Sequence, residues 1–193
     1  MEDLLQWFFA ASPISNSAIS ETRDVFEARA QKIFPSLLKH GFSESDASLI
    51  YSMIGEIGNN AFDHNLGFWK DQPGCYFDFA IDQSGVTLAL ADRGRGMFSS
   101  LKRVMVSLKD DQEAIETAFQ KVISGRSPEQ RGNGLKFVRQ IINGNPNRGL
   151  VARSGSGTLA FGGKTAWIKS ATQHLSEGPA SVGTVILIRW ERP

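Results

Sequence analysis

Apolar residues recur with helical spacing through the segment 43–64, which gives the clearest structural signal in the sequence. They stand three or four residues apart, at Ala47, Ile50, Ile54, Ile57 and Ala61. This spacing places them on one side of a helix, and Ser43 with Asp46 forms a weak capping box at its start. The pattern predicts a long helix over 43–64 whose apolar side faces a core.

Two further helical segments are expected before residue 43. The apolar run 4–9 predicts a short helix packed on the domain, with a surface for a partner protein as the alternative. A longer stretch, 20–39, has Ser20 as its expected cap and Gly41 as its end. Pro35 is expected to kink or split this helix, because proline lacks the N–H that a helix interior needs.

Short apolar runs bounded by turn residues predict strands in the second half of the chain. Two of them, 75–82 and 86–91, flank a tight polar turn and predict a hairpin. Helical segments are expected over 97–124 and 135–143, with a loop at 127–134. Four more strands are expected, at 150–153, 158–161, 166–168 and 184–190. This order predicts an α+β domain: a two-layer α/β sandwich with a mixed, mostly antiparallel sheet and helices on one face.

Composition narrows the class of protein. The 193 residues, 41% of them hydrophobic, suit one compact domain, alone or with a short appendage. Lys and Arg number 21 against 20 Asp and Glu, a balance unlike the basic footprint of nucleic-acid-binding proteins. No apolar run reaches the length of a membrane span, no secretory signal is recognised, and a single cysteine, Cys75, excludes an internal disulfide. We therefore expect a cytoplasmic protein that binds neither nucleic acid nor membrane.

The first candidate site is the polar side of the 43–64 helix. Glu56 and Asn60 stand four residues apart and share one helix face, with Asp63 on the same side. A carboxylate beside an amide offers oxygen ligands that suit Mg²⁺, which also borrows oxygens from a phosphate substrate. An ordinary solvated helix face is the alternative, and the spacing alone favours it.

The second candidate lies where the predicted strand 86–91 ends, in the sequence Asp92-Arg93-Gly94-Arg95-Gly96. Asp92 is placed to accept a hydrogen bond from a ligand amine, and the two glycines allow the backbone to approach a ligand closely. Ser99 stands where a dinucleotide-binding motif requires its third glycine. A plain turn after a strand explains these residues equally well when they are taken alone.

The third candidate is a glycine-rich helix start, Arg131-Gly132-Asn133-Gly134-Leu135. Backbone N–H groups exposed at such a start, together with the helix dipole, favour a phosphate group. Arg126 and Arg131 add positive charge nearby. The alternative is a flexible loop, which is common before a helix.

Other features of the sequence carry weaker signals. Gly163-Lys164-Thr165 has the form of a P-loop end, but Thr158 stands where a glycine is required, and the segment is expected among strands. A P-loop is therefore not expected. Cys75 has no basic or histidine neighbour in the sequence, which favours a buried small residue over a nucleophile.

Taken in order, the three candidate segments resemble the motifs of the GHKL superfamily, which includes gyrase-type ATPases, the large heat-shock chaperones, histidine kinases and mismatch-repair ATPases. Residues 56–64 resemble its N-box, 92–96 its first glycine box, and 132–135 its second. Gly183-Thr184 is similar to the late Gly-Thr of the family. The compact size, the histidine that closes the N-box and Gly125-Arg126-Ser127 are most similar to the bacterial anti-sigma-factor serine kinases.

This resemblance implies an ATP-binding domain of the Bergerat fold over 43–193, with 1–42 as a helical appendage and a lid over about 97–131. It implies ATP and Mg²⁺ as cofactors. Glu56 would act as a general base and Asn60 would bind Mg²⁺. Asp92, supported by Thr184, would receive the adenine amino group. The remaining contacts to ATP would come from Gly94, Gly96, Arg131, Gly132, Asn133, Gly134 and Leu135.

The sequence leaves several functions open. The first is a stand-alone protein kinase or ATP-dependent regulator of a partner protein. The second is an ATP-hydrolysing conformational switch, although such relatives carry a further domain for which little chain follows Trp190. The third is a histidine-kinase-type catalytic domain with a separate phosphoacceptor, because His40 is followed by Gly41-Phe42 rather than an acidic residue. A module that uses ATP only for assembly, and a homodimer formed through the apolar N-terminal helices, are further alternatives.

Overall fold

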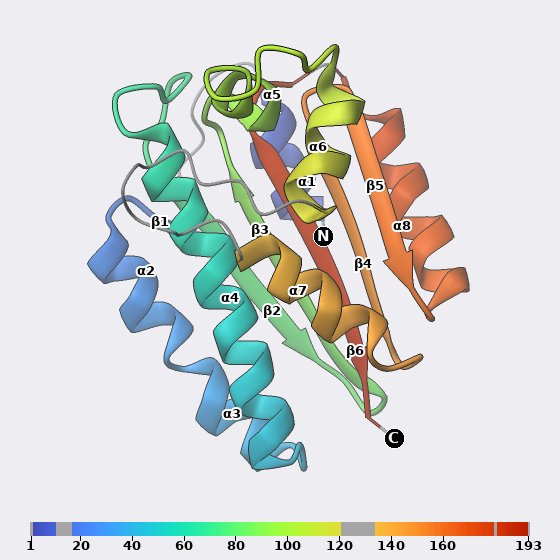
Figure 1. Ribbon diagram of the computed structural model, residues 1–193. Coiled ribbons are helices and arrows are strands. Elements are labelled where there is room, and N and C mark those ends of the chain that lie inside the picture. Colours follow the sequence, from blue (N-terminus) through green and yellow to red (C-terminus); the bar gives the residue numbers. More distant parts are fainter. Residues whose placement is uncertain (1, 11–16, 121–133, 180, 193) are drawn as a thin grey trace.

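The computed structural model describes residues 2–10, 17–120, 134–179 and 181–192, which form one sheet covered by helices (Figure 1). The strands are β1 (Ile19–Ser20), β2 (Cys75–Ile81), β3 (Gly85–Asp92), β4 (Arg148–Ser154), β5 (Gly157–Gly162) and β6 (Thr184–Glu191). The helices are α1 (Glu2–Phe9), α2 (Arg23–Ala30), α3 (Ile33–Lys39), α4 (Glu44–Asn65), α5 (Gly96–Leu101), α6 (Asp111–Gln120), α7 (Gly134–Asn143) and α8 (Thr165–Glu177).

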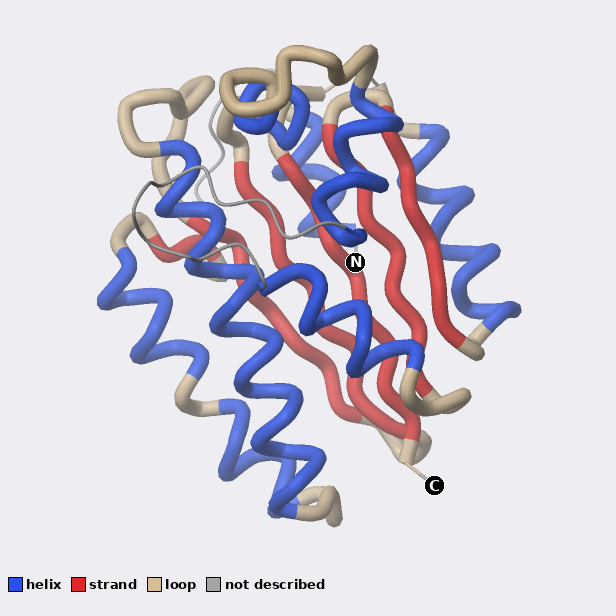
Figure 2. The backbone as a smooth tube through the Cα atoms, in the orientation of Figure 1, coloured by secondary structure: helices blue, strands red, loops and turns tan. Residues whose placement is uncertain are grey.

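The strands lie in the order β1-β2-β3-β6-β4-β5, and each described pair is antiparallel. The last strand of the sequence, β6, therefore lies inside the sheet between β3 and β4 (Figure 2). Its pairing with β3 places Asp92 opposite Thr184. Two residues that are remote in the sequence thereby become neighbours at one end of the sheet.

The main core lies between the sheet and the layer that contains α2, α3, α4 and α7 (Figure 1). The predicted helix over 43–64 is confirmed: the Ser43 hydroxyl accepts a hydrogen bond of 3.1 Å from the Asp46 N–H. The apolar stripe of α4 is buried against the sheet, whose side chains in this core include Leu88, Leu90, Leu150, Ala152, Ile186 and Ile188. The α+β class and the two-layer α/β arrangement are thus confirmed.

A second, smaller core lies on the opposite face of the sheet, where α1 and α8 pack. Leu4, Trp7 and Phe8 are fully buried there, next to Leu175 of α8. The expectation that the N-terminal helix packs on the domain is confirmed. The expected placement of helices on one face alone is therefore wrong, and so is a mixed sheet, since each described strand pair is antiparallel. Residues 1–42 contribute to the sheet and to both of its faces, because β1 pairs with β2, α2 and α3 pack in the main core and α1 packs here.

Two predictions near the N-terminus need correction. Ser20 does not cap a helix: it pairs with Cys75 in the sheet, and the hydroxyl of Thr22 caps α2 instead. The break between α2 and α3 falls at residues 31–32. Pro35 lies in the first turn of α3, where the missing N–H would have no helical partner and is tolerated.

The strand predicted at 166–168 is wrong, because these residues belong to α8. A run of three apolar residues is compatible both with the two-residue period of a strand and with the 3.6-residue period of a helix. Only the spacing to Ala171 and Leu175, which are buried in the second core, indicates a helix. Consequently Gly163-Lys164-Thr165 does stand between a strand and a helix. Lys164 forms an ion pair with Glu191 there, on a strand of the sheet.

The segment predicted as a lid, 97–131, is described as far as residue 120. It contains α5 and α6, and α6 is fixed by apolar packing: Ile115 and Phe119 are fully buried in the main core. Phe119 also contacts Phe161 of β5 edge-on, with 5.6 Å between the ring centroids. No helix in the described part of the chain is both long and apolar enough to cross a membrane.

Candidate functional site

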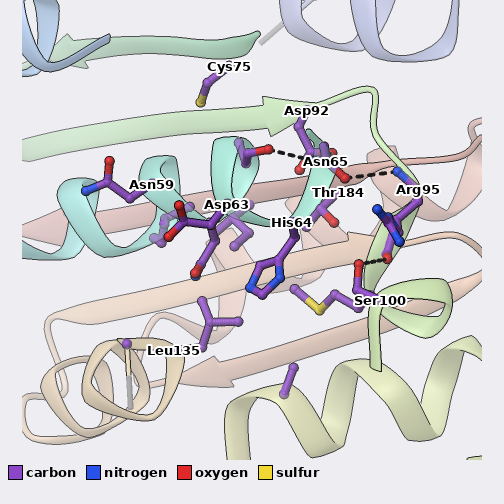
Figure 3. A pocket seen from close by; sticks show the side chains of 18 of the residues that line it. Asn59, Asp63, His64, Asn65, Cys75, Asp92, Arg95, Ser100, Leu135 and Thr184 are labelled. Atoms are coloured by element: carbon purple, nitrogen blue, oxygen red, sulfur yellow. Dashed lines mark hydrogen bonds between the residues drawn. The ribbon is translucent and has the colours of Figure 1, made fainter. Parts of the chain in front are cut away.

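A cavity of about 830 Å³ lies beside the end of the sheet where β3 stops and β6 begins, with α4, α5 and α7 contributing to its walls (Figure 3). The predicted site residues that line it are Glu56, Asn60, Asp92, Gly96, Gly134, Leu135 and Thr184. Gly94 is not among the lining residues. Arg131, Gly132 and Asn133 lie outside the residues that the structure describes. Segments that are far apart in the sequence thus meet around one cavity.

Asp92 is the buried carboxylate of this cavity, with 8% of its surface exposed. Its Oδ1 accepts hydrogen bonds from Asn65 Nδ2 and from the Gly94 N–H, both at 2.9 Å. Burial raises the pKa of Asp92 to about 7, and the donors from Gly94, Asn65 and the Thr184 backbone offset this effect only in part. Since these donors are neutral, the ionised form of Asp92 remains costly to bury.

Asn65, the last residue of α4, is a site residue that sequence reasoning missed. Its amide donates to the Ala61 carbonyl at 2.9 Å as well as to Asp92, and its Oδ1 accepts from the Arg95 N–H at 3.0 Å. A signal was present in the sequence, because Asn65 follows Ala61 by four residues and so continues the apolar stripe with a polar side chain. Such a residue in a core position needs hydrogen-bond partners.

Position 94 must be a glycine because the Asn65 side chain occupies the space that a side chain there would need. A Cβ atom at position 94 would lie 1.9 Å from the Asn65 Cγ, closer than any real contact. The absence of a side chain therefore lets the turn close over the Asn65 amide, rather than bringing the backbone to a ligand as the sequence suggested. Gly96 has a φ of +76°, a backbone conformation that favours glycine, and it does line the cavity. The backbone of the cavity wall therefore depends on a glycine at this position.

Ser154, at the end of β4, connects three parts of the site. Its hydroxyl accepts a hydrogen bond of 2.8 Å from the Met97 N–H at the start of α5. The same oxygen lies 3.2 Å from the Gly183 carbonyl and 3.2 Å from the Thr184 hydroxyl. Ser154 thereby fixes α5 against the start of β6. Nothing in the local sequence distinguishes this serine, because its role depends on strand order.

The two arginines of the Asp92–Gly96 turn point to different parts of the molecule. Arg93 is fully buried, pairs with Asp71, and donates to the backbone carbonyls of Trp7 and Ala10, so it anchors α1. Arg95 lies in the cavity wall, with its guanidinium 3.2 Å from the centroid of the Phe68 ring. Burial, followed by the charge of Arg103, lowers the pKa of Arg95. This part of the cavity wall is therefore both cationic and aromatic.

The polar face of α4 forms another part of the cavity wall. Arg23 of α2 donates to Asn59 Oδ1 at 3.2 Å and forms an ion pair with Asp63, which the sequence placed beside Glu56. Glu56 lies against the start of α7, since a Cβ atom at Gly134 would be 2.2 Å from Glu56 Oε2. A carboxylate at this position is favoured by the helix dipole.

Cys75 also lines the cavity, in the strand beside Asp92. Burial, and then the charge of Asp92, raises the pKa of the Cys75 thiol well above its usual range. The predicted buried cysteine is thus confirmed, and its thiol is unsuited to act as a nucleophile. Within the described ranges, His, Cys, Asp and Glu side chains form no group of three or more that could hold a metal ion by themselves.

Comparison with protein-family models gives no match for this chain, and comparison with curated proteins gives none either.

Proposed function

We propose that this chain is an ATP- and Mg²⁺-binding domain of the GHKL type, and that it acts as a stand-alone protein kinase or as an ATP-dependent regulator of a partner protein. The observation that carries the proposal is the convergence of the helix face at Glu56, the turn at Asp92, the helix start at Gly134 and Thr184 on one cavity. Each feature alone has an ordinary explanation, but ordinary surface features have no reason to meet. The volume, about 830 Å³, lies within the range of about 300–1,000 Å³ common for small-molecule sites.

The Asp92 end of the cavity suits an adenine base. A buried carboxylate that is compensated only by neutral donors gains from a further donor, and the amino group of adenine supplies one. The walls around it include Ile57, Leu90 and Ile186, which offer apolar surface to a flat ring. Thr184, paired with Asp92 across the sheet, would support this contact.

The other end of the cavity suits phosphates and Mg²⁺. The start of α7 provides a helix N-terminus at the wall, where backbone N–H groups and the helix dipole favour an anion. Asn60 would hold Mg²⁺ through its side-chain oxygen, with phosphate oxygens and water as the other ligands, as is usual for this ion. When bound, the ion would neutralise phosphate charge.

Glu56 is the residue that we propose as general base. Its carboxylate lies at the cavity wall, where it could accept the proton of an attacking hydroxyl group or water molecule. If the acceptor is a hydroxyl of a partner protein the chain is a kinase, and if it is water the chain is an ATPase switch. The proposal places this activity in the cytoplasm, where Mg-ATP is available.

Calorimetric titration with Mg-ATP tests binding, and radiolabelled ATP tests the fate of the γ-phosphate. We expect the wild type to bind Mg-ATP, and Asn60→Ala to lose much of the Mg²⁺ dependence of binding. Glu56→Gln is expected to bind ATP and to lose phosphoryl transfer. A wild type that binds no ATP would refute the proposal. Steady phosphate release without transfer to any protein would favour the ATP-hydrolysing switch.

A further inference from the structure

We propose that Asn65 is the positioning residue that makes this cavity select a 6-amino purine over a 6-oxo purine, an inference that rests on the proposed ATP site. Asn65 is 3% exposed and stands at the junction of α4 with the Asp92 turn. In Figure 3 its side chain lies directly beside that of Asp92 at one end of the cavity. The selection follows from what the amide does to this carboxylate.

The amide of Asn65 has only one orientation that satisfies its contacts. Nδ2 donates to the Ala61 carbonyl and to Asp92 Oδ1, while Oδ1 accepts from the Arg95 N–H. A flipped amide would place a donor against the Arg95 N–H and an acceptor against two oxygens. The side chain is therefore locked as a donor toward Asp92.

This lock fixes the carboxylate of Asp92 in turn. Its Oδ1 receives both the Asn65 amide and the Gly94 N–H at 2.9 Å, so the group cannot rotate without losing both bonds. Because Asn65 belongs to α4, the same contact holds Asp92 in register with Glu56 and Asn60 on that helix. The adenine end and the phosphate end of the proposed site are thus connected through the side-chain amide of Asn65.

Donation from Asn65 also favours the ionised form of Asp92 over the protonated form. A hydrogen bond to the ionised form stabilises it, and an ionised carboxylate only accepts. A protonated Asp92 could instead donate to a carbonyl oxygen and would tolerate a 6-oxo purine. Loss of the Asn65 donor favours the protonated form, so it should weaken selection as well as affinity.

Several other charged or titratable groups share the cavity with this carboxylate. Cys75 stands beside it in β2, and His64, Arg95 and Arg103 line the same cavity from α4 and from the α5 side. Their effects must be separated from that of Asn65. Inosine triphosphate provides this separation, because it shares the ribose and phosphates of ATP but carries an oxygen in place of the amino group.

The experiment is calorimetric titration of Mg-ATP and Mg-inosine triphosphate into the wild type, Asn65→Ala and Asn65→Leu. The second substitution nearly keeps the side-chain size and carries no hydrogen-bond donor. We expect the wild type to prefer ATP, and the ratio of its affinities for ATP and inosine triphosphate to fall about tenfold in both variants. This is less than removal of the Asp92 acceptor itself would cost, because Asn65 acts on the ligand only through Asp92. Asn145→Ala, which removes an asparagine from a turn outside the cavity lining, is expected to leave the ratio unchanged.

The outcomes separate this inference from the function on which it rests. A wild type that binds neither nucleotide overturns both. A wild type that prefers ATP, with folded Asn65 variants that lose affinity for both nucleotides equally, overturns the selection role alone. Variants that do not fold, as judged by circular dichroism, would show that Asn65 supports the fold rather than selection, and would also overturn the inference.

Discussion

Two aspartates on either side of β3 show how differently the same carboxyl group is used in this molecule. Asp82 precedes the strand and is held by Arg189, with N–O distances of 2.8 and 3.0 Å, while its side chain remains 57% exposed. Asp92 ends the strand, is 8% exposed and receives only neutral donors. The Arg189 guanidinium holds the pKa of Asp82 well below its usual range, whereas burial raises that of Asp92 to about 7.

The difference separates a carboxylate that supports the fold from the one that we propose as a ligand acceptor. Asp82 gains stability from a cation at little desolvation cost. Asp92 is buried at a cost to stability, and the surrounding residues Asn65, Gly94 and Thr184 orient it without neutralising it. Sites that trade stability for function are common where a ligand completes the interactions.

The largest effect on stability is expected from adding a side chain at Gly94, where the Asn65 side chain already fills the space. In Gly94→Ala the added Cβ would lie 1.9 Å from the Asn65 Cγ, and we expect a loss of about 3 kcal/mol in the free energy of unfolding. Gly55→Ala on α4 is the matched control, because a Cβ there meets no atom within 4 Å. We expect that control to be neutral or to gain about 0.5 kcal/mol, since alanine favours a helix. Equal urea midpoints for Gly94→Ala and the wild type would contradict the role given to Asn65.

The pH dependence of stability should reveal Asp92. Its pKa is about 7 in the folded chain against an ordinary value of 3.8, so between these values the folded state retains a proton that the unfolded state releases. The free energy of unfolding should therefore fall as the pH rises from about 4 to about 7. Asp92→Asn should remove this dependence and be more stable than the wild type at pH 8 by on the order of 2 kcal/mol. Denaturant titrations of both proteins across this pH range measure the effect. The same pH dependence of unfolding free energy in the wild type and in Asp92→Asn would contradict its assignment to Asp92.

Asp82 should show the opposite sign and a smaller effect. Its pKa is lowered in the folded state, so its contribution is present above about 4 and is lost as the pH falls further. Because the group is exposed, Asp82→Asn should cost only about 1 kcal/mol at pH 7. The same denaturant titrations measure this, and a cost at pH 7 that did not shrink in acid would indicate that the Arg189 pair is not its source.

The fold was predictable where the signal is local. The stripe of α4 repeats over several turns, and the hairpin of β2 and β3 has a polar turn between two apolar runs, so both were identified from the sequence. The helix at Thr165–Glu177 was not, because the short run 166–168 fits a strand as well as a helix, and the core partners of Trp167 and Ile168 come from α1 and the far face of the sheet. Such an assignment depends on tertiary packing.

The site was predictable through the residues that face the cavity, but not through those that hold them. Glu56, Asn60 and Asp92 stand in recognisable motifs, and the structure brings them to one cavity. Asn65 and Ser154 act through contacts between α4, β4 and the Asp92 turn. Their roles depend on which segments become neighbours, which sequence order alone does not state.

The most direct test compares Asp92→Asn and Asp82→Asn with the wild type in calorimetric titrations with Mg-ATP at pH 8, where Asp92 is largely ionised. The two substitutions make the same chemical change on either side of one strand. We predict that Asp92→Asn weakens binding by about a hundredfold, as expected for the loss of a hydrogen bond to a charged group, while Asp82→Asn binds like the wild type. Equal affinities for the wild type and Asp92→Asn, or no binding by the wild type, would contradict the assignment of Asp92 as the ligand acceptor.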